Sequence, residues 1–295
     1  MTIVLFVHTH ISGERLMKPF GWTGSLMVLT MFSQWPDPAI AQEKPLWEVG
    51  LGIASIQLPA YRGAVETSSE VLPIPYLVYR GEFVKADKDG VRGVLFDSDR
   101  FEINLSFAAS PPVNSQNIKV RRNMPDLLPS LELGPSMDIR LWQSSDQATE
   151  LKLFVPVRAA FTLESNPQYI GWQFGPRINL DVSNPWGMQG WTLGTVGGPV
   201  FGSREQHSFF YGVAPQHATA DRPAYEAKAG YAGLQVLAAL WKRYPSYWLG
   251  GFVRYDSVSG AVFEDSPLAT QKGRFAGGIA ISWILGQSSQ TVRVD

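Results

Sequence analysis

The stretch "IGWQFGPRINLDV", residues 170–182, alternates large apolar residues with small or polar residues. Successive side chains of a β-strand point to opposite faces, whereas the apolar positions of a helix recur with a period of about 3.6 residues. A strand of this length exceeds the roughly 5–6 residues that are usual in soluble sheets, and it suits a tilted membrane strand of roughly 9–11 residues or slightly more. The stretch therefore predicts a transmembrane strand with Trp172, Phe174 and Ile178 facing lipid.

The same two-residue period recurs along the chain in both directions. Large residues occupy every second position over 47–53 and again over 101–107. Segments of this kind occur near 46–57, 72–84, 91–98, 100–109, 130–142, 149–163, 168–182, 190–202, 207–214, 224–241, 246–257 and 274–285. Turn-rich sequences separate them, as at 87–90 and 183–187. We interpret the pattern as an all-β fold, an antiparallel transmembrane β-barrel of twelve strands with both termini on the periplasmic side.

The polar positions of these strands would line the inside of the barrel. The predicted lumen-facing residues are Glu102, Asn104, Lys152, Arg158, Gln173, Arg177, Asn179 and Asp181. Their mixed charges indicate ion pairs that cross the lumen. A soluble β-sandwich with an aromatic core is the alternative, but the frequent glycines inside the segments would weaken the strands of a sandwich. A strongly curved barrel can use them for close packing.

A secretory leader is expected before the first strand. Residues 39–41 form an A-x-A cleavage pattern, an apolar run occupies 20–32, and Lys18 precedes that run. We therefore divide the chain into an upstream extension plus signal peptide, 1–41, whose true start could be Met17, and an outer-membrane β-barrel, 42–295, with cleavage after Ala41. An N-terminal membrane anchor is the alternative, although the run is shorter than the roughly 20 residues of a spanning helix.

Composition excludes several classes of function. Lysine plus arginine number 25 and aspartate plus glutamate 26, so no strongly basic face indicates a nucleic-acid partner. The chain has no cysteine, and therefore has neither a disulfide nor a thiolate metal site. The glycine pairs lie inside predicted strands, without the strand–glycine–helix context of a nucleotide site. We expect no metal, no cofactor and no nucleic acid.

Catalytic side chains are scarce in the barrel region, where the only histidines are His207 and His217. His207 and Ser208 are neighbours on a predicted strand, so their side chains would point to opposite faces. A base must lie within roughly 2.6–3.2 Å of its nucleophile, and the pair therefore predicts no dyad and no enzyme. The basic cluster at 119–122 could bind lipopolysaccharide phosphates or could be a solvated loop.

Short motifs in a fixed order resemble the MipA/OmpV family of outer-membrane proteins of Gram-negative bacteria. The motifs extend over essentially all of the chain after the leader. The residues that carry the resemblance are Pro59, Tyr61, Gly63, Pro75, Tyr76, Tyr79, Arg80, Gly81, Gly134, Pro135, Gly198, Pro199, Tyr211, Gly212, Val213, Tyr225 and Gly230.

This resemblance implies a location in the outer membrane, in contact with its lipid and lipopolysaccharide. One family member is described as a scaffold that joins a lytic transglycosylase to a murein synthase at the cell wall, and others are described as surface antigens or adhesins. By this resemblance the chain is a non-enzymatic scaffold, with the long connections 110–129 and 214–224 as candidate partner-binding loops. The polar inner face leaves a small-solute channel as the alternative.

Overall fold

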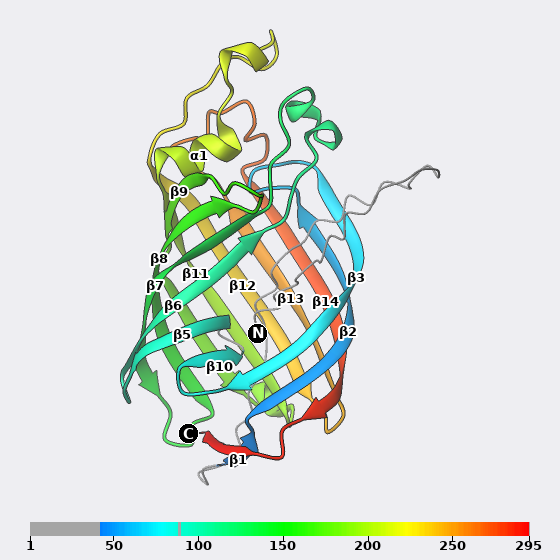
Figure 1. Cartoon of the computed structure of the whole chain (residues 1–295), viewed down its shortest axis with the longest axis vertical. Helices are drawn as coiled ribbons and strands as arrows, with labels where there is room; N and C mark the ends of the chain where they lie inside the picture. The colour runs from blue at the N-terminus through cyan, green and yellow to red at the C-terminus, as the bar shows by residue number, and fades with distance from the viewer. Residues whose placement is uncertain (1–41, 88–89, 295) are drawn as a thin grey trace.

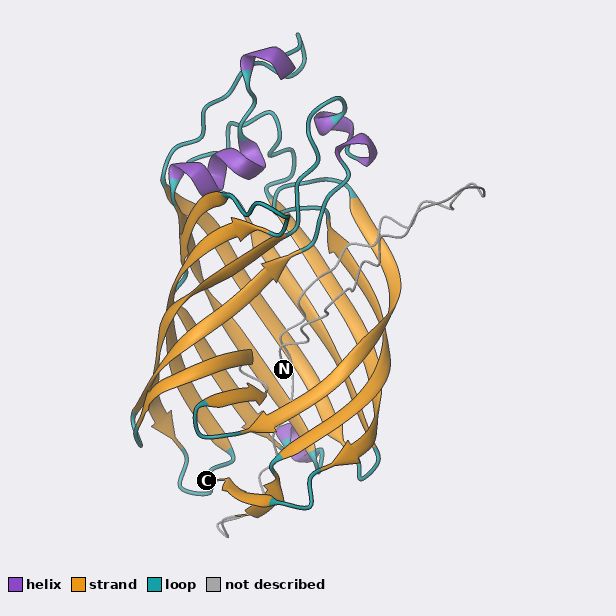
Figure 2. Ribbon diagram, viewed as in Figure 1, coloured by secondary structure: helices purple, strands orange, loops and turns teal. Residues whose placement is uncertain are grey.

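The chain folds into a closed, twelve-stranded antiparallel β-barrel with a small ribbon at one end and folded loops at the other (Figures 1 and 2). The computed structural model describes residues 42–87 and 90–294. The predicted leader, 1–41, and its cleavage site lie outside the described residues. The predicted fold class is confirmed.

Each wall strand pairs with the next along the chain, and β14 pairs with β2 to close the barrel. Because β9 and β10 continue each other, they count as one membrane strand. The bounds are β2 Trp47–Pro59, β3 Thr67–Arg80, β4 Val84–Asp87, β5 Gly90–Asp97, β6 Phe101–Ser110, β7 Ser130–Gln143, β8 Thr149–Thr162, β9 Tyr169–Phe174, β10 Arg177–Ser183, β11 Trp191–Gly202, β12 Gly230–Arg243, β13 Tyr247–Ser257 and β14 Gly273–Gln287.

The stretch 170–182 forms this interrupted strand. Gly175 and Pro176 separate β9 from β10, and Pro176 lacks the N–H that a continuous ladder needs. Both halves nevertheless pair with β8 on one side and β11 on the other. The alternation of the stretch breaks at its first large residue. A bulge at Gly171, with a φ of +115°, shifts the register against β8 and leaves Ile170 buried rather than facing outward.

One predicted strand is a helix instead. Residues 207–214 overlap α1, Arg204–Tyr211, followed by a short irregular segment. The Ser203 hydroxyl accepts a hydrogen bond from the backbone N–H of Gln206, which is the usual way a serine begins a helix. This local cap determines the structure here, and the two-residue alternation of large and small residues carries no signal for it.

Another predicted segment joins two strands. The segment 72–84 spans the end of β3 and the first residue of β4. β4 and β5 pair with each other and have only four and eight residues, and residues 88–89 between them lie outside the described part. The predicted number of strands is therefore right because one helix was counted as a strand and one short strand was missed.

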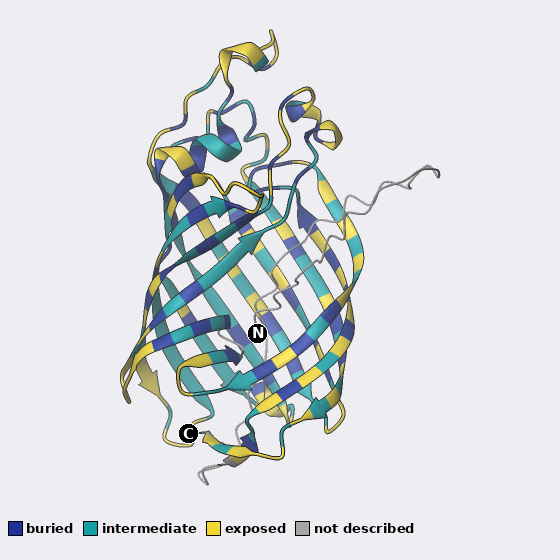
Figure 3. Cartoon of the chain, in the orientation of Figure 1, coloured by how far each residue is buried: buried dark blue, intermediate teal, exposed yellow. Residues whose placement is uncertain are grey.

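Exposure separates the outer face of the wall from the inner face (Figure 3). Trp172 and Ile178 are 41% and 46% exposed, whereas Asn179 is 8% exposed. Phe174 lies on the outer face, where its ring is 5.9 Å from that of Phe201. Other exposed apolar residues of the wall include Leu51, Ile53, Val71, Val157, Val253, Phe275 and Ile279. An apolar outer band of this kind is typical of a barrel surrounded by lipid.

The first and last described segments meet outside the barrel wall. β1, Gln42–Pro45, pairs antiparallel with β15, Thr291–Val294, in a separate two-stranded sheet. We call this sheet the terminal ribbon. It lies at the end of the barrel that carries the short turns (Figure 1), which in outer-membrane barrels is the periplasmic end.

Four long connections fold together at the opposite end, and we call them the loop cap. They are 60–66, 111–129, 203–229 and 258–272. Their apolar side chains form a shared cluster in which the rings of Tyr211 and Phe263 stack with centroids 3.7 Å apart. The Tyr61 hydroxyl donates to the Leu268 carbonyl oxygen at 2.8 Å. The connections therefore pack on one another as an ordered lid.

Candidate functional site: the lumen and the two barrel ends

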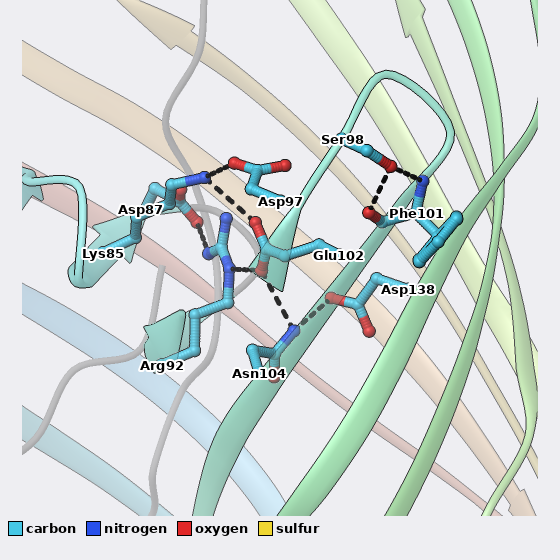
Figure 4. Close-up of polar contacts among 9 residues, drawn as sticks. All are labelled: Lys85, Asp87, Arg92, Asp97, Ser98, Phe101, Glu102, Asn104 and Asp138. Atoms are coloured by element: carbon cyan, nitrogen blue, oxygen red, sulfur yellow. Dashed lines mark hydrogen bonds and ion pairs between the residues drawn. The ribbon is translucent and has the colours of Figure 1, made fainter. Parts of the chain in front are cut away.

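One side of the lumen, formed by β4–β8 and β10, is charged. Near the terminal ribbon, Lys85 contacts Asp97 at 2.6 Å and Glu102 at 3.0 Å (Figure 4). Arg92 contacts Asp87 and Glu102, both at 2.6 Å. These charge-assisted contacts join three neighbouring strands, so they fix the side chains of this wall against one another.

Asn104 extends the network to β7. Its buried side-chain amide donates to Glu102 at 3.0 Å and to Asp138 at 2.9 Å (Figure 4). Further along the wall, the Asn179 amide donates to Asp181 at 3.1 Å, and Lys152 pairs with Glu150 at 2.8 Å. All of these contacts join side chains within the charged wall.

The structure places all the predicted lumen-facing residues on the inner face. The register pairs Asn179 with Lys152 and Gln173 with Arg158, so each pair shares a face. Val157, the neighbour of Arg158, is 44% exposed on the outer face. The inner-face residues are Glu102, Asn104, Lys152, Arg158, Gln173, Arg177, Asn179 and Asp181.

The other side of the lumen, formed by β2, β3 and β12–β14, is apolar over its middle and carries charged side chains toward both ends. Its buried inward side chains include Ala54, Ile56, Leu58, Ile74, Tyr76, Val78, Ala239, Trp241, Trp248, Phe252, Ala276 and Ala280. The expectation of a polar lumen therefore describes only one of its two walls. In this half the inward positions are alanine, aliphatic or aromatic residues, and the two-residue alternation alone did not distinguish an apolar inner face from a polar one.

A buried carboxylate lies at the terminal end of the apolar wall. Glu48 is 3% exposed and contacts Arg80 at 2.8 Å and Arg243 at 2.9 Å. It also accepts a hydrogen bond from the Tyr76 hydroxyl at 3.1 Å. Two of the motif residues, Tyr76 and Arg80, therefore contact the same buried carboxylate. Removing either side chain would leave the negative charge of Glu48 with fewer partners in a buried position.

Several other motif residues meet in the loop cap. The Tyr61 and Tyr211 rings lie 6.0 Å apart, and the Tyr211 hydroxyl donates to the Arg62 carbonyl oxygen at 2.8 Å. Val213 and Tyr225 exchange backbone hydrogen bonds across an isolated bridge. Three further motif residues lie next to these in the chain: Gly63 is in the first connection of the cap, Gly212 follows the last residue of α1, and Gly230 begins β12.

The other motif residues lie in the barrel wall or directly after a strand: Pro59 in β2, Pro75 and Tyr79 in β3, Gly81 after β3, Gly134 and Pro135 in β7, and Gly198 and Pro199 in β11.

Arg121 is the central polar anchor of the loop cap. It is 3% exposed, and its guanidinium donates to the carbonyl oxygens of Phe210 and Pro125 and to the Ser115 hydroxyl. Burial lowers the pKa of this guanidinium from its ordinary value. Neither interpretation of the cluster 119–122, a phosphate-binding site or a solvated loop, describes Arg121. Apolar residues scattered through the same connection, such as Val113, were the sequence signal for a packed loop.

The histidines do not form a catalytic arrangement in the described part of the chain. His207 lies in α1 rather than on a strand, so the opposite-face argument does not apply to it. Its Nδ1 is 2.6 Å from the Lys228 carbonyl oxygen and must therefore donate, and no hydrogen bond joins it to Ser208. Burial lowers the pKa of His207. His217 lies in a short 3₁₀ turn of the cap, Pro215–His217.

No group of three or more histidine, cysteine or acidic side chains among the described residues could hold a metal ion. In the same residues, no helix has both the length and the apolar character needed to cross a membrane.

Known proteins resemble this chain in family and in general fold. Two solved structures are similar: a bacterial polysaccharide outer membrane secretin, with 8% identity, a TM-score of 0.40 and coverage of 84% of this chain and 99% of that one, and a Pseudomonas aeruginosa FadL homologue, with 12% identity, a TM-score of 0.30 and coverage of 72% and 61%. No curated protein matches the sequence. The family model described as MltA-interacting protein MipA matches residues 49–285, and the chain therefore belongs to the MipA family of outer-membrane β-barrel proteins.

Proposed function

We propose that this chain is a non-enzymatic outer-membrane anchor that holds a peptidoglycan enzyme at its periplasmic end. The observation that carries the proposal is the terminal ribbon, which pairs β1 with β15 outside the barrel wall. Because a two-stranded ribbon has two outer edges, it can accept a further strand through main-chain hydrogen bonds. The family description names an interacting protein, and a lytic transglycosylase and a murein synthase are the partners that the resemblance implies.

The long loops are poorly located for such a partner. The sequence favours the connections 110–129 and 214–224 as partner-binding loops. Both lie in the loop cap, at the opposite end of the barrel from the terminal ribbon (Figure 1). Long loops of outer-membrane barrels face the cell exterior, whereas peptidoglycan lies on the periplasmic side. We therefore transfer the proposed partner-binding role from the loops to the terminal ribbon.

The test is binding of a purified MltA-type lytic transglycosylase to the barrel in detergent. Leu46 donates to Gln290, so even-numbered residues of β15 face β1 and odd-numbered residues face its outer edge. Arg293→Pro therefore removes a backbone donor from that outer edge and should weaken binding about tenfold, which corresponds to about 1.4 kcal/mol. A variant with shortened 214–224 is the matched control at the other end and should bind normally. Heat-dependent gel migration checks that both barrels fold. Loss of binding in the loop variant alone would contradict the assignment to the ribbon.

A small-solute channel is the second candidate, favoured by the charged inner wall. The loop cap argues against it, because the apolar cluster of the cap includes the inward residues Val200 and Ala232 near the strand ends and so lies over the barrel mouth. Conductance across a planar bilayer distinguishes the two. We expect no stable open state, and a steady conductance would replace the anchor with a channel.

A further inference from the structure

The barrel wall is incomplete between β3 and β6. One edge of β3 pairs with β2 along its whole length. Its other edge pairs with β4, and only at Tyr79 and Arg80. On the facing side of β6, β5 pairs no further than Ser106. Among the described residues, no strand therefore covers 67–78 of β3 or 107–110 of β6 on these sides. We call this stretch without strand pairing the wall gap, and it lies above the short β4–β5 hairpin in Figure 1.

The sequence of β3 prevents another strand from closing the wall gap. The Arg80 N–H donates to Leu46, next to β2, and the Glu66 carbonyl accepts from Ala60 on the same side. Even-numbered residues of β3 therefore direct their peptide groups toward β2, and odd-numbered residues direct theirs into the gap. Pro73 and Pro75 are odd-numbered and have no N–H, so the exposed edge lacks two of the donors that a further strand would need.

The outer margins of the wall gap are apolar. Val71 of β3 is 65% exposed, and Phe83 and Leu95, at the β4–β5 hairpin, are 78% and 70% exposed. The loop cap bounds the gap at the other end, where the Lys119 N–H donates to the Glu66 carboxylate at 2.9 Å. The opening is therefore set in the lipid-facing part of the wall rather than in an aqueous loop region.

Inside, the wall gap lies where the two lumen walls meet. β3 and β2 on one side carry the apolar residues Ile74 and Ile56. On the other side, Arg158 of β8 donates to the Ser106 hydroxyl at 2.9 Å, at the last paired residue of β6. A molecule that passes through the gap would meet an apolar surface on one flank and a guanidinium group on the other.

A second arginine of this wall lacks any acceptor. The Arg177 side chain makes no hydrogen bond or ion pair to the described residues, and its Nε is buried. Glu132 and Asp138 share its surroundings without pairing to it, and Asp138 already accepts hydrogen bonds from Asn104 and Ser136. A buried N–H without an acceptor is costly, and oxygen atoms of an anionic group would satisfy this Nε and the two terminal nitrogens of the guanidinium.

From these observations we infer that the wall gap admits a single-chain anionic lipid from the surrounding membrane. Its carboxylate would lie at Arg177 and Arg158, and its acyl chain would extend past Ile74 and Val71 into the bilayer. The apolar margins match the chain and the two guanidinium groups match the head group. This site is independent of the terminal ribbon, which lies at the periplasmic end.

The experiment uses the full barrel in phosphatidylcholine nanodiscs. The chain has no native cysteine, so Val71→Cys places a single fluorophore at the gap. Ile279→Cys places one on β14 as the control, because the Ile279 side chain is 68% exposed and that of Val71 is 65% exposed. The quencher is palmitate with a nitroxide on its chain, at alkaline pH, and its methyl ester serves as the uncharged control. We expect saturable quenching by the acid at Val71→Cys only, and no saturable quenching by the ester.

Arg177→Gln in the Val71→Cys background should weaken the apparent affinity for the acid about tenfold. Arg140→Gln is the charge-matched control, because Arg140 lies on the same wall but is paired with Glu150 at 2.8 Å. Heat-dependent gel migration confirms folding of each variant. Equal quenching at both cysteine positions, or an Arg177→Gln affinity equal to that of the parent, would overturn the inference. Slow hydrogen exchange at the Leu77 amide without lipid would also overturn it, because a strand would then fill the gap.

Discussion

At the scale of single residues, adjacent positions of one strand meet opposite environments. Ile178 is 46% exposed on the outer face, whereas Asn179 is 8% exposed and donates to Asp181 inside the lumen. In a bilayer the first position contacts hydrocarbon and the second contacts polar groups and water. The same change should therefore have very different effects at the two positions.

Ile178→Arg should lower the free energy of unfolding by about 2–4 kcal/mol, the cost of a lipid-facing cation near the midplane of a membrane barrel. Asn179→Arg should be tolerated far better, because Asp181 can pair with the new charge. Urea unfolding in lipid vesicles, followed by tryptophan fluorescence, measures both. Equal losses would indicate two packed faces and hence a soluble sandwich.

His207 makes the loop cap sensitive to pH. Burial lowers the pKa of its imidazole below the ordinary 6.5, the hydrogen bond to Lys228 opposes this shift, and the charge of Arg62 adds to it. The unfolded side chain then binds a proton more readily than the folded one, so the cap keeps its full stability above about pH 6.5 and loses stability as the pH falls below that value.

Hydrogen exchange of α1 amides should therefore accelerate between pH 7.5 and pH 5, after correction for the intrinsic rate. His207→Phe retains an aromatic ring against Phe263, 4.8 Å away in the native cap, and should abolish this extra acceleration. Barrel assembly should be unchanged in His207→Phe and in His217→Ala. An identical pH response in parent and His207→Phe would assign the effect to another group.

At the scale of elements, two motif glycines allow strands to approach closely. A Cβ on Gly198 of β11 would lie 2.0 Å from the Pro176 carbonyl oxygen, and a Cβ on Gly134 of β7 would lie 2.1 Å from the Val157 carbonyl oxygen. Both oxygens belong to backbone and cannot rotate away. The break between β9 and β10 is therefore packed directly against β11.

Gly198→Ala should destabilise the barrel by roughly 1–3 kcal/mol, the usual cost of overpacking. Gly175→Ala is the matched control, because its Cβ would have its nearest contact at 3.6 Å, from the Pro199 carbonyl oxygen. Urea midpoints of the two variants in the same detergent measure the difference. Equal stability of both would show that the strands can separate without cost at this position.

The two-residue period predicted most strands because each has one face in contact with lipid, as at 101–107 and 172–182. It did not predict α1, where a local serine cap determines the structure, or the short β4–β5 hairpin, whose pattern is too brief to separate from β3. Sequence placed the lumen polar residues on the inner face, but it did not detect the wall gap, because strand length is set by pairing with distant neighbours.

At the scale of the whole molecule, the two ends of the barrel are different. One end is covered by the loop cap, in which Tyr61, Arg121 and Tyr211 join connections that lie far apart in sequence. The other end carries short turns and the terminal ribbon (Figure 1). From this asymmetry we infer an orientation with the cap outside the cell and the ribbon in the periplasm, and the proposed anchor function depends on it.

Labelling of single cysteines in intact cells tests this central claim most directly. Asp221→Cys lies in the exposed part of the loop cap, and Ser145→Cys lies in the exposed turn between β7 and β8 at the ribbon end. With a membrane-impermeant maleimide, we predict labelling of Asp221→Cys in intact cells and of Ser145→Cys only after the outer membrane is permeabilised. Labelling of Ser145→Cys in intact cells, with Asp221→Cys protected or equally labelled, would contradict the account.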